Sequence, residues 1–119
     1  MPMNTRWFAL SLSLLAFVLQ GCSDGCKNTV VQAVVSPDGA LAATAFTRDC
    51  GATTAQTVQV YLGAKSDAVP DAGNVFRGTH SGKVTVQWHG DKKLLITTDA
   101  ETFLLMKEYA GVSIELLRN

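Results

Sequence analysis

The fold of this chain is decided by the stretch "VVQAVVSPDGALAATAF" at residues 30–46. Two runs of β-branched and small apolar residues flank the sequence Ser36-Pro37-Asp38-Gly39. Proline fixes φ at the first turn position, aspartate tolerates the next conformation, and glycine accepts a positive φ. A three-residue loop that ends in a left-handed glycine is a common connection in β-hairpins. The stretch therefore predicts two antiparallel strands joined by a loop at residues 37–39.

This loop also predicts the register of the hairpin. With residues 37–39 in the loop, Val34 faces Ala42, and the same register continued outward places Cys26 opposite Cys50. A shift by one residue would turn one cysteine to the other face of the sheet, because side chains alternate along a strand. The turn chemistry and the cysteine positions therefore indicate one register.

The N-terminal segment has the features of a secretory signal. Arg6 is the only charged residue before Asp24, and residues 7–19 are mostly apolar. Such a run suits the roughly 7–15 apolar residues of a signal peptide, and it is shorter than the roughly 20 of a transmembrane helix. We expect residues 1–21 to be a signal peptide.

The end of that segment, Leu19-Gln20-Gly21-Cys22, resembles the lipobox of bacterial lipoproteins. The resemblance implies that the thiol of Cys22 takes a diacylglyceryl group and that cleavage after Gly21 leaves this cysteine at the N-terminus. Two acyl chains hold a protein firmly on a membrane, whereas one binds reversibly. An ordinary secreted protein, or a membrane helix that ends in cysteine, is the alternative.

The lipoprotein resemblance also carries an expectation about location. In Gram-negative lipoproteins, aspartate directly after the lipidated cysteine is the best-known inner-membrane retention signal, and this chain has Ser23 there. The resemblance favours a cell-envelope protein on the outer membrane, facing the periplasm if the host is Gram-negative. We expect a lipidated tether at residues 22–27 and a single β domain at residues 28–119.

Composition limits the partners. Removing residues 1–21 from the 119 leaves 98, enough for one domain with a modest core. The remainder carries nine basic and ten acidic residues, because Arg6 is the only charge removed. It has neither the basic footprint of a nucleic-acid binder nor a polybasic run for lipid headgroups. We expect contact with the membrane through the anchor and with another envelope protein, and no nucleic acid.

Export would place Cys26 and Cys50 in an oxidising compartment, where paired thiols persist as disulfides. With Cys22 assigned to lipid, we predict a Cys26–Cys50 disulfide that contributes on the order of 3 kcal/mol. The alternatives are two free thiols, or a metal site with His80 or His89. Metal sites prefer closely spaced ligand pairs, so we expect neither a metal nor another cofactor.

The rest of the chain shows further strand patterns. Residues 56–63 alternate, with Val58, Val60 and Leu62 on one face. Residues 74–78 suggest a short strand, and residues 83–98 a second hairpin. Residues 101–117 indicate a third hairpin or a closing strand, with a short helix at residues 101–109 as the alternative.

Short strands at regular spacing predict an all-β fold, a small antiparallel sandwich or a partly open barrel of hairpins. Residues 64–74 form a surface loop in this prediction, long enough to be a contact site. Phe46 and Trp88 are expected in the core, because both lie within strand patterns.

The most distinctive polar stretch is "RDCGATT" at residues 48–54. It is a candidate recognition loop built from Arg48, Asp49, Thr53 and Thr54. The favoured interpretation is structural: the first two residues pair or cap the turn, and the threonines satisfy backbone groups.

No catalytic constellation stands out, whether a Ser-His-Asp set, paired carboxylates or a metal cluster. His80 and His89 would each need a partner and a pocket for acid–base work, and His89 beside Gly90 and Asp91 is most simply a turn residue. We therefore expect a protein that is not an enzyme and has no catalytic residue.

The combination of "SPDG" and "RDCGATT", with "GNVF", "VQWHGDKKLLI" and "GVSIEL" downstream, resembles a group of small bacterial envelope proteins of unknown function. The resemblance covers the whole chain after Cys22. It implies export, a mainly β domain and a structural role for Cys50, and it supplies no activity. The favoured hypothesis is a lipid-anchored binding or interaction module. The alternatives are a structural or stress-related envelope lipoprotein and, less favoured, a small hydrolase.

Overall fold

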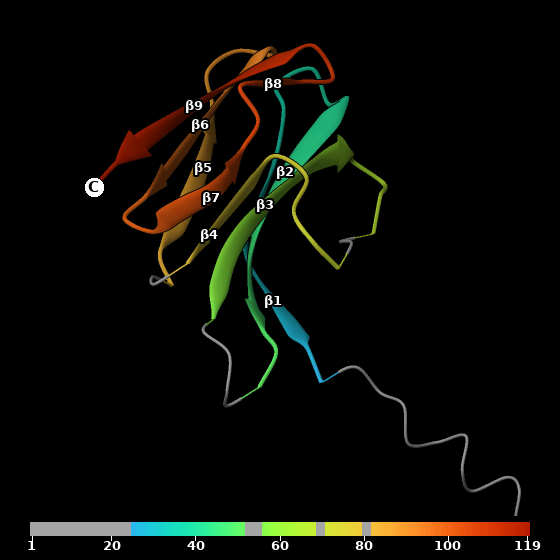
Figure 1. Cartoon of the computed structure of the whole chain (residues 1–119). Coiled ribbons are helices and arrows are strands. Elements are labelled where there is room, and N and C mark those ends of the chain that lie inside the picture. The colour runs from blue at the N-terminus through green and yellow to red at the C-terminus, as the bar shows by residue number, and fades with distance from the viewer. Residues whose placement is uncertain (1–24, 52–55, 69–70, 80–81) are drawn as a thin grey trace, which may run out of the picture.

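The computed structural model (Figure 1) describes residues 25–51, 56–68, 71–79 and 82–119, which form nine strands and no helix. Two sheets pack face to face as a β sandwich, which confirms the predicted fold class. Sheet A has the order β1 (Lys27–Val35), β2 (Leu41–Asp49), β3 (Thr57–Ala64), β4 (Phe76–Thr79), β7 (Glu101–Leu105). Sheet B has the order β5 (Val84–Trp88), β6 (Lys93–Thr98), β9 (Val112–Arg118), β8 (Glu108–Tyr109).

The core lies between the two sheets and is filled from alternate strand positions. Val58, Val60 and Leu62 on β3 are fully buried, as their alternation predicts. Trp88 is half-buried and packs against this core. The sheet B contribution comes from Val84, Val86, Leu94, Ile96, Val112 and Ile114.

The first hairpin forms, but its predicted register is wrong near the turn. Val34 lies opposite Ala43 instead of Ala42, so the loop contains four residues, Pro37 to Ala40. The backbone N–H of Leu41 donates to Ser36 Oγ, and the N–H of Ser36 donates to Leu41 O at 2.8 Å. These bonds make Ser36 and Leu41 the closing pair, which draws Ala40 into the loop.

A β-bulge at Val31 brings the cysteines back into line. The register shifts by one residue between Val30 and Gln32, so Lys27 lies opposite Asp49 at the outer end of the hairpin. Cys26 and Cys50 form the predicted disulfide directly beyond that pair. The predicted pairing is confirmed, whereas the uniform register behind it is wrong.

The C-terminal region consists of strands β7, β8 and β9, and the alternative helix at residues 101–109 is wrong. β7 pairs with β4 and therefore belongs to sheet A. The chain then reverses between β8 and β9 through Ala110 and Gly111, with φ values of 52° and 77°. Two successive positive φ values suit a tight hairpin turn.

One strand pair departs from the predicted antiparallel arrangement. β6 and β9 are parallel, with Lys93 beside Ser113 and Ile96 beside Leu116. The chain leaves sheet B after β6, crosses to sheet A as β7, and returns through β8 to the end where β6 began. β9 then runs in the same direction as β6, which a meander of hairpins would not produce.

The sandwich has two distinct ends. At one end, which we call the disulfide pole, the Cys26–Cys50 bridge lies beside the pairs Lys27–Asp49 and Thr57–Thr79. At the other end, the turn pole, lies the loop of residues 37–40. β1 spans the distance between the two poles (Figure 1).

Candidate functional site

The outer face of sheet A, which points away from sheet B, carries the candidate site. Strand register places its side chains in three rows across β1, β2 and β3. From the disulfide pole to the turn pole, these rows are Val30–Phe46–Gln59, Ala33–Thr44–Tyr61 and Val35–Ala42–Gly63. One end of this face is covered by another segment of the chain, and the other end is open.

The half nearer the disulfide pole is covered by residues 71–74. The N–H of Gly73 donates to Gln59 Oε1 at 2.7 Å, and Arg77 Nε donates to Gly73 O at 2.8 Å. Asn28 Nδ2 donates to Asp71 O at 3.4 Å, which holds the far end of the segment. Phe46 beneath it is 0% exposed. Phe46 is therefore buried as predicted, but on the outer face and not between the sheets.

Two residues allow residues 71–74 to lie so close to the sheet. A Cβ at Gly73 would be 2.6 Å from Val60 O, so only glycine fits without a backbone shift. The Asn74 amide accepts from Leu62 N and donates to Leu62 O, each at 2.8 Å. This side chain thereby extends the β3 ladder beyond the start of β4.

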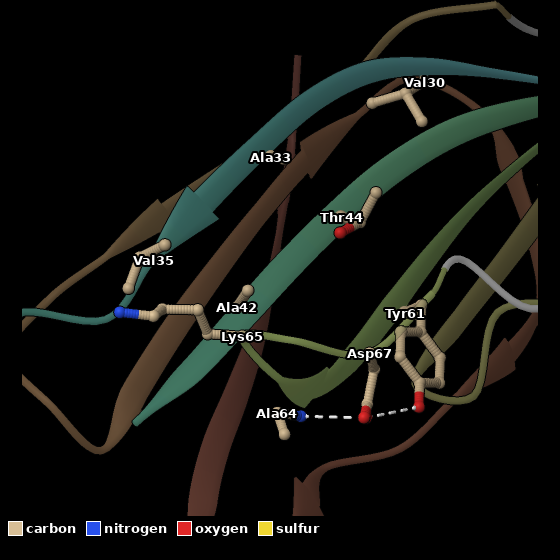
Figure 2. A pocket seen from close by; sticks show the side chains of 9 residues that line it. All are labelled: Val30, Ala33, Val35, Ala42, Thr44, Tyr61, Ala64, Lys65 and Asp67. Atoms are coloured by element: carbon tan, nitrogen blue, oxygen red, sulfur yellow. Dashed lines mark hydrogen bonds between the residues drawn. The ribbon is translucent and has the colours of Figure 1, made fainter. Parts of the chain in front are cut away.

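The half nearer the turn pole is open and forms a trough of about 250 Å³ (Figure 2). Small side chains make its floor, namely Ala33, Ala42 and Thr44. Val30 and Val35 form the β1 side, and they are 50% and 45% exposed. Small residues between larger ones hollow the surface of the sheet, so apolar groups face solvent here.

The opposite wall of the trough is Tyr61, held in place by Asp67. Tyr61 Oη donates to Asp67 Oδ2 at 3.2 Å, and the same oxygen accepts from Ala64 N at 3.0 Å (Figure 2). Partial burial and then this hydrogen bond raise the pKa of the Tyr61 phenol above its ordinary 10.0. A Cβ at Gly63 would be 2.6 Å from Tyr61 Cε1. Gly63 therefore leaves room for the ring to lie beside the trough.

Lys65 provides a cation at the rim of the trough. Its side chain extends in the direction of Val35 (Figure 2). Within the described residues, the ammonium group makes no ion pair, and Asp67 is already engaged by Tyr61 and Ala64. The trough thus combines an apolar floor with an available positive charge.

Two of the four residues of the predicted recognition loop, Arg48 and Asp49, lie in the described part of the chain. Arg48 Nη1 donates to Asn28 Oδ1 at 2.9 Å, and Asp49 Oδ1 accepts from Gly51 N at 3.0 Å. Asp49 thus caps the turn that holds Cys50, which agrees with the structural interpretation. Thr53 and Thr54 lie outside the described residues. Neither Arg48 nor Asp49 is among the described residues that line the trough.

Metal-ligating side chains do not gather in the part of the chain that the structure describes. No group of three or more His, Cys, Asp or Glu side chains in these ranges is placed to bind a metal ion. His89 is exposed in the β5–β6 turn, where its backbone N–H donates to Lys93 O, and His80 lies outside the described residues. In the described part of the chain, no helix has the length and apolar character needed to cross a bilayer.

Comparisons with known proteins add no relative. No family model matches the chain, and neither the curated proteins nor the solved structures contain a match.

Sequence reasoning did not identify the trough. It marked residues 64–74 as a contact loop, and Lys65 and Asp67 of that loop do line the site. A signal for the floor was present in Ala33, Ala42 and Thr44, which are small where an outer strand face usually carries larger polar residues. Recognising this floor required the register of the structure, because the predicted register places Ala33, Ala42 and Thr44 opposite other residues.

Proposed function

We propose that this protein is a lipid-anchored, non-enzymatic interaction module of the bacterial cell envelope. Its trough binds an extended segment of another envelope protein. The lipobox at Leu19 to Cys22 supports the anchor, and the open half of sheet A supports the interaction. The single observation that carries the binding role is an apolar trough with an available ammonium group at its rim.

The size of the trough favours side chains of a protein over a cofactor. Small-molecule sites usually measure about 300–1,000 Å³ and enclose most of the ligand. A trough of about 250 Å³ that opens along one side suits one or two aliphatic side chains. Burying one such side chain contributes about 1.5–3 kcal/mol.

Charge complementarity defines the rest of the ligand. Lys65 would pair with a carboxylate placed next to the aliphatic side chain. Such a charge-assisted hydrogen bond is stronger than one between neutral groups. The expected partner therefore presents an extended segment in which an aliphatic residue is followed by Asp, Glu or a C-terminal carboxylate.

Photo-crosslinking in cells tests this proposal with the full-length protein. A benzophenone amino acid replaces Ala33 in the trough or, as a control, exposed Thr85 on β5 of sheet B. We expect one discrete protein adduct from position 33 and none from position 85. Lys65→Glu should reduce the adduct severalfold, and Lys107→Glu, the same charge change at a lysine that does not line the trough, should leave it unchanged.

Three outcomes would overturn the binding role. One is equal crosslinking from both positions, which would indicate nonspecific proximity. Another is an adduct at position 33 that does not respond to Lys65→Glu. The third is adducts made only of phospholipid, which would show that the trough contacts the membrane instead of a protein.

A further inference from the structure

The disulfide ties the start of the β domain to the end of β2. Cys26 precedes β1 and is bonded to Cys50, which follows β2. Residues 27–30 of β1 therefore cannot detach from the sheet to lengthen the chain before them. Any force applied at the N-terminus acts on the disulfide pole.

The lipid anchor proposed above lies very close to this point in sequence. Only Ser23, Asp24 and Gly25 separate Cys22 from Cys26. Four Cα steps reach at most about 14 Å, even when fully extended. Lipidation of Cys22 would thus keep the disulfide pole within that distance of the bilayer.

The turn pole lies much farther away. β1 has nine residues, which span about 30 Å at the rise of an antiparallel strand. β5 follows the same direction, because Val86 N donates to Gln32 Oε1 and Trp88 Nε1 donates to Val34 O. Gly82, which precedes β5, is therefore near the disulfide pole, and Ala40 is at the turn pole.

We infer that the disulfide pole is the membrane-facing surface of this protein and that the Cys26–Cys50 bridge sets its height above the bilayer. The trough begins at Val30, four residues beyond Cys26, and extends towards the turn pole. It opens sideways above the headgroups, where a protein segment reaches it from the aqueous phase. This inference rests on the lipid anchor of the proposed function.

Paramagnetic relaxation tests this orientation. The full-length lipidated protein is placed in phosphatidylcholine vesicles that contain a nickel-chelating lipid, and nitroxide labels are attached at Gly82→Cys, Ala33→Cys or Ala40→Cys. All three positions are exposed in the structure. We expect relaxation by the nickel to be severalfold stronger at position 82 than at position 40, with position 33 close to position 40.

A second comparison in this experiment tests the role of the disulfide. Replacing Cys26 and Cys50 together by Ser lets the start of β1 detach, so the difference between positions 82 and 40 should shrink. An unchanged difference would show that the bridge does not set the height.

The outcomes separate the orientation from the anchor. If the protein does not float with vesicles, the proposed lipid anchor fails. If it floats but relaxation at position 40 equals or exceeds that at position 82, the orientation is wrong. Strongest relaxation at position 33 would mean that the outer face of sheet A lies on the lipid, which also contradicts the inference.

Discussion

The indole Nε1 of Trp88 donates a hydrogen bond of 2.9 Å to the backbone oxygen of Val34, and thereby joins sheet B to sheet A. The two residues lie on β5 and β1, edge strands that belong to different sheets. Gln32 adds a second link, because its Oε1 accepts from Val86 N at 2.9 Å. Hydrogen bonds that involve side chains thus connect these two edge strands, whereas a closed barrel would join them by a continuous ladder of backbone hydrogen bonds.

Trp88→Phe should lower the free energy of unfolding. The phenyl ring keeps part of the packing, but Val34 O loses its donor, and an unpaired group of this kind costs about 1–3 kcal/mol. Urea unfolding followed by circular dichroism measures the change. Thr85→Val on the exposed side of the same strand is the control, and an equal loss there would deny Trp88 any special role.

Cys26→Ser and Cys50→Ser should lower stability equally, each by on the order of 3 kcal/mol. The double variant should match either single variant, because the two residues form one bridge. Thermal unfolding of the oxidised proteins measures this. Additive losses would mean that the cysteines stabilise the fold separately.

Asn74→Ala should destabilise the sandwich, because it leaves both Leu62 N and Leu62 O without their partner. The expected loss is about 1–3 kcal/mol for each group that water does not reach. Asn74→Asp keeps an acceptor for Leu62 N but sets a carboxylate oxygen against Leu62 O, and two acceptors repel each other, so its loss should be larger. If chemical denaturation ranks the two variants in reverse, the amide does not extend the ladder as described.

Asp38 should make stability depend on acid. Its hydrogen bond from Ser36 Oγ at 2.6 Å, and then that from Ala40 N, hold its pKa below the ordinary 3.8. A carboxylate with a lowered folded-state pKa stabilises the protein above the unfolded pKa. This stabilisation is lost as the pH falls through the folded-state value. Melting temperatures from pH 7 to about pH 2 should therefore fall more steeply for the native protein than for Asp38→Asn.

Cys22→Ser should release the protein from membranes and leave an unprocessed precursor, because it removes the thiol that we propose carries the lipid. Fractionation of cells, with mass spectrometry of the N-terminus, measures both effects. Membrane attachment equal to that of the native protein would contradict the lipobox prediction.

Local patterns predicted much of the fold. Alternation identified the residues of β3 that face the core, and "SPDG" located the first hairpin. The sequence also predicted the cysteine pairing, although the uniform register from which the pairing was inferred is wrong. The Ser36–Leu41 closing pair shifts the register by one residue from the predicted one. The bulge at Val31 shifts it back, so the register at Cys26 is the predicted one.

Other features depended on contacts between distant segments. The parallel pairing of β6 with β9 follows from the crossing of β7 to sheet A, which no local pattern encodes. The burial of Phe46 depends on residues 71–74, which fold back over the outer face.

The sequence by itself determined most of the strands, the place of the first hairpin and the disulfide partners, because alternation and turn chemistry act between near neighbours in the chain. Only the tertiary structure decided which part of the outer face stays open. The trough exists because a loop covers one end of sheet A and stops short of the other. How much of sheet A this loop covers depends on packing between side chains that are distant in the sequence, so local sequence patterns do not predict it.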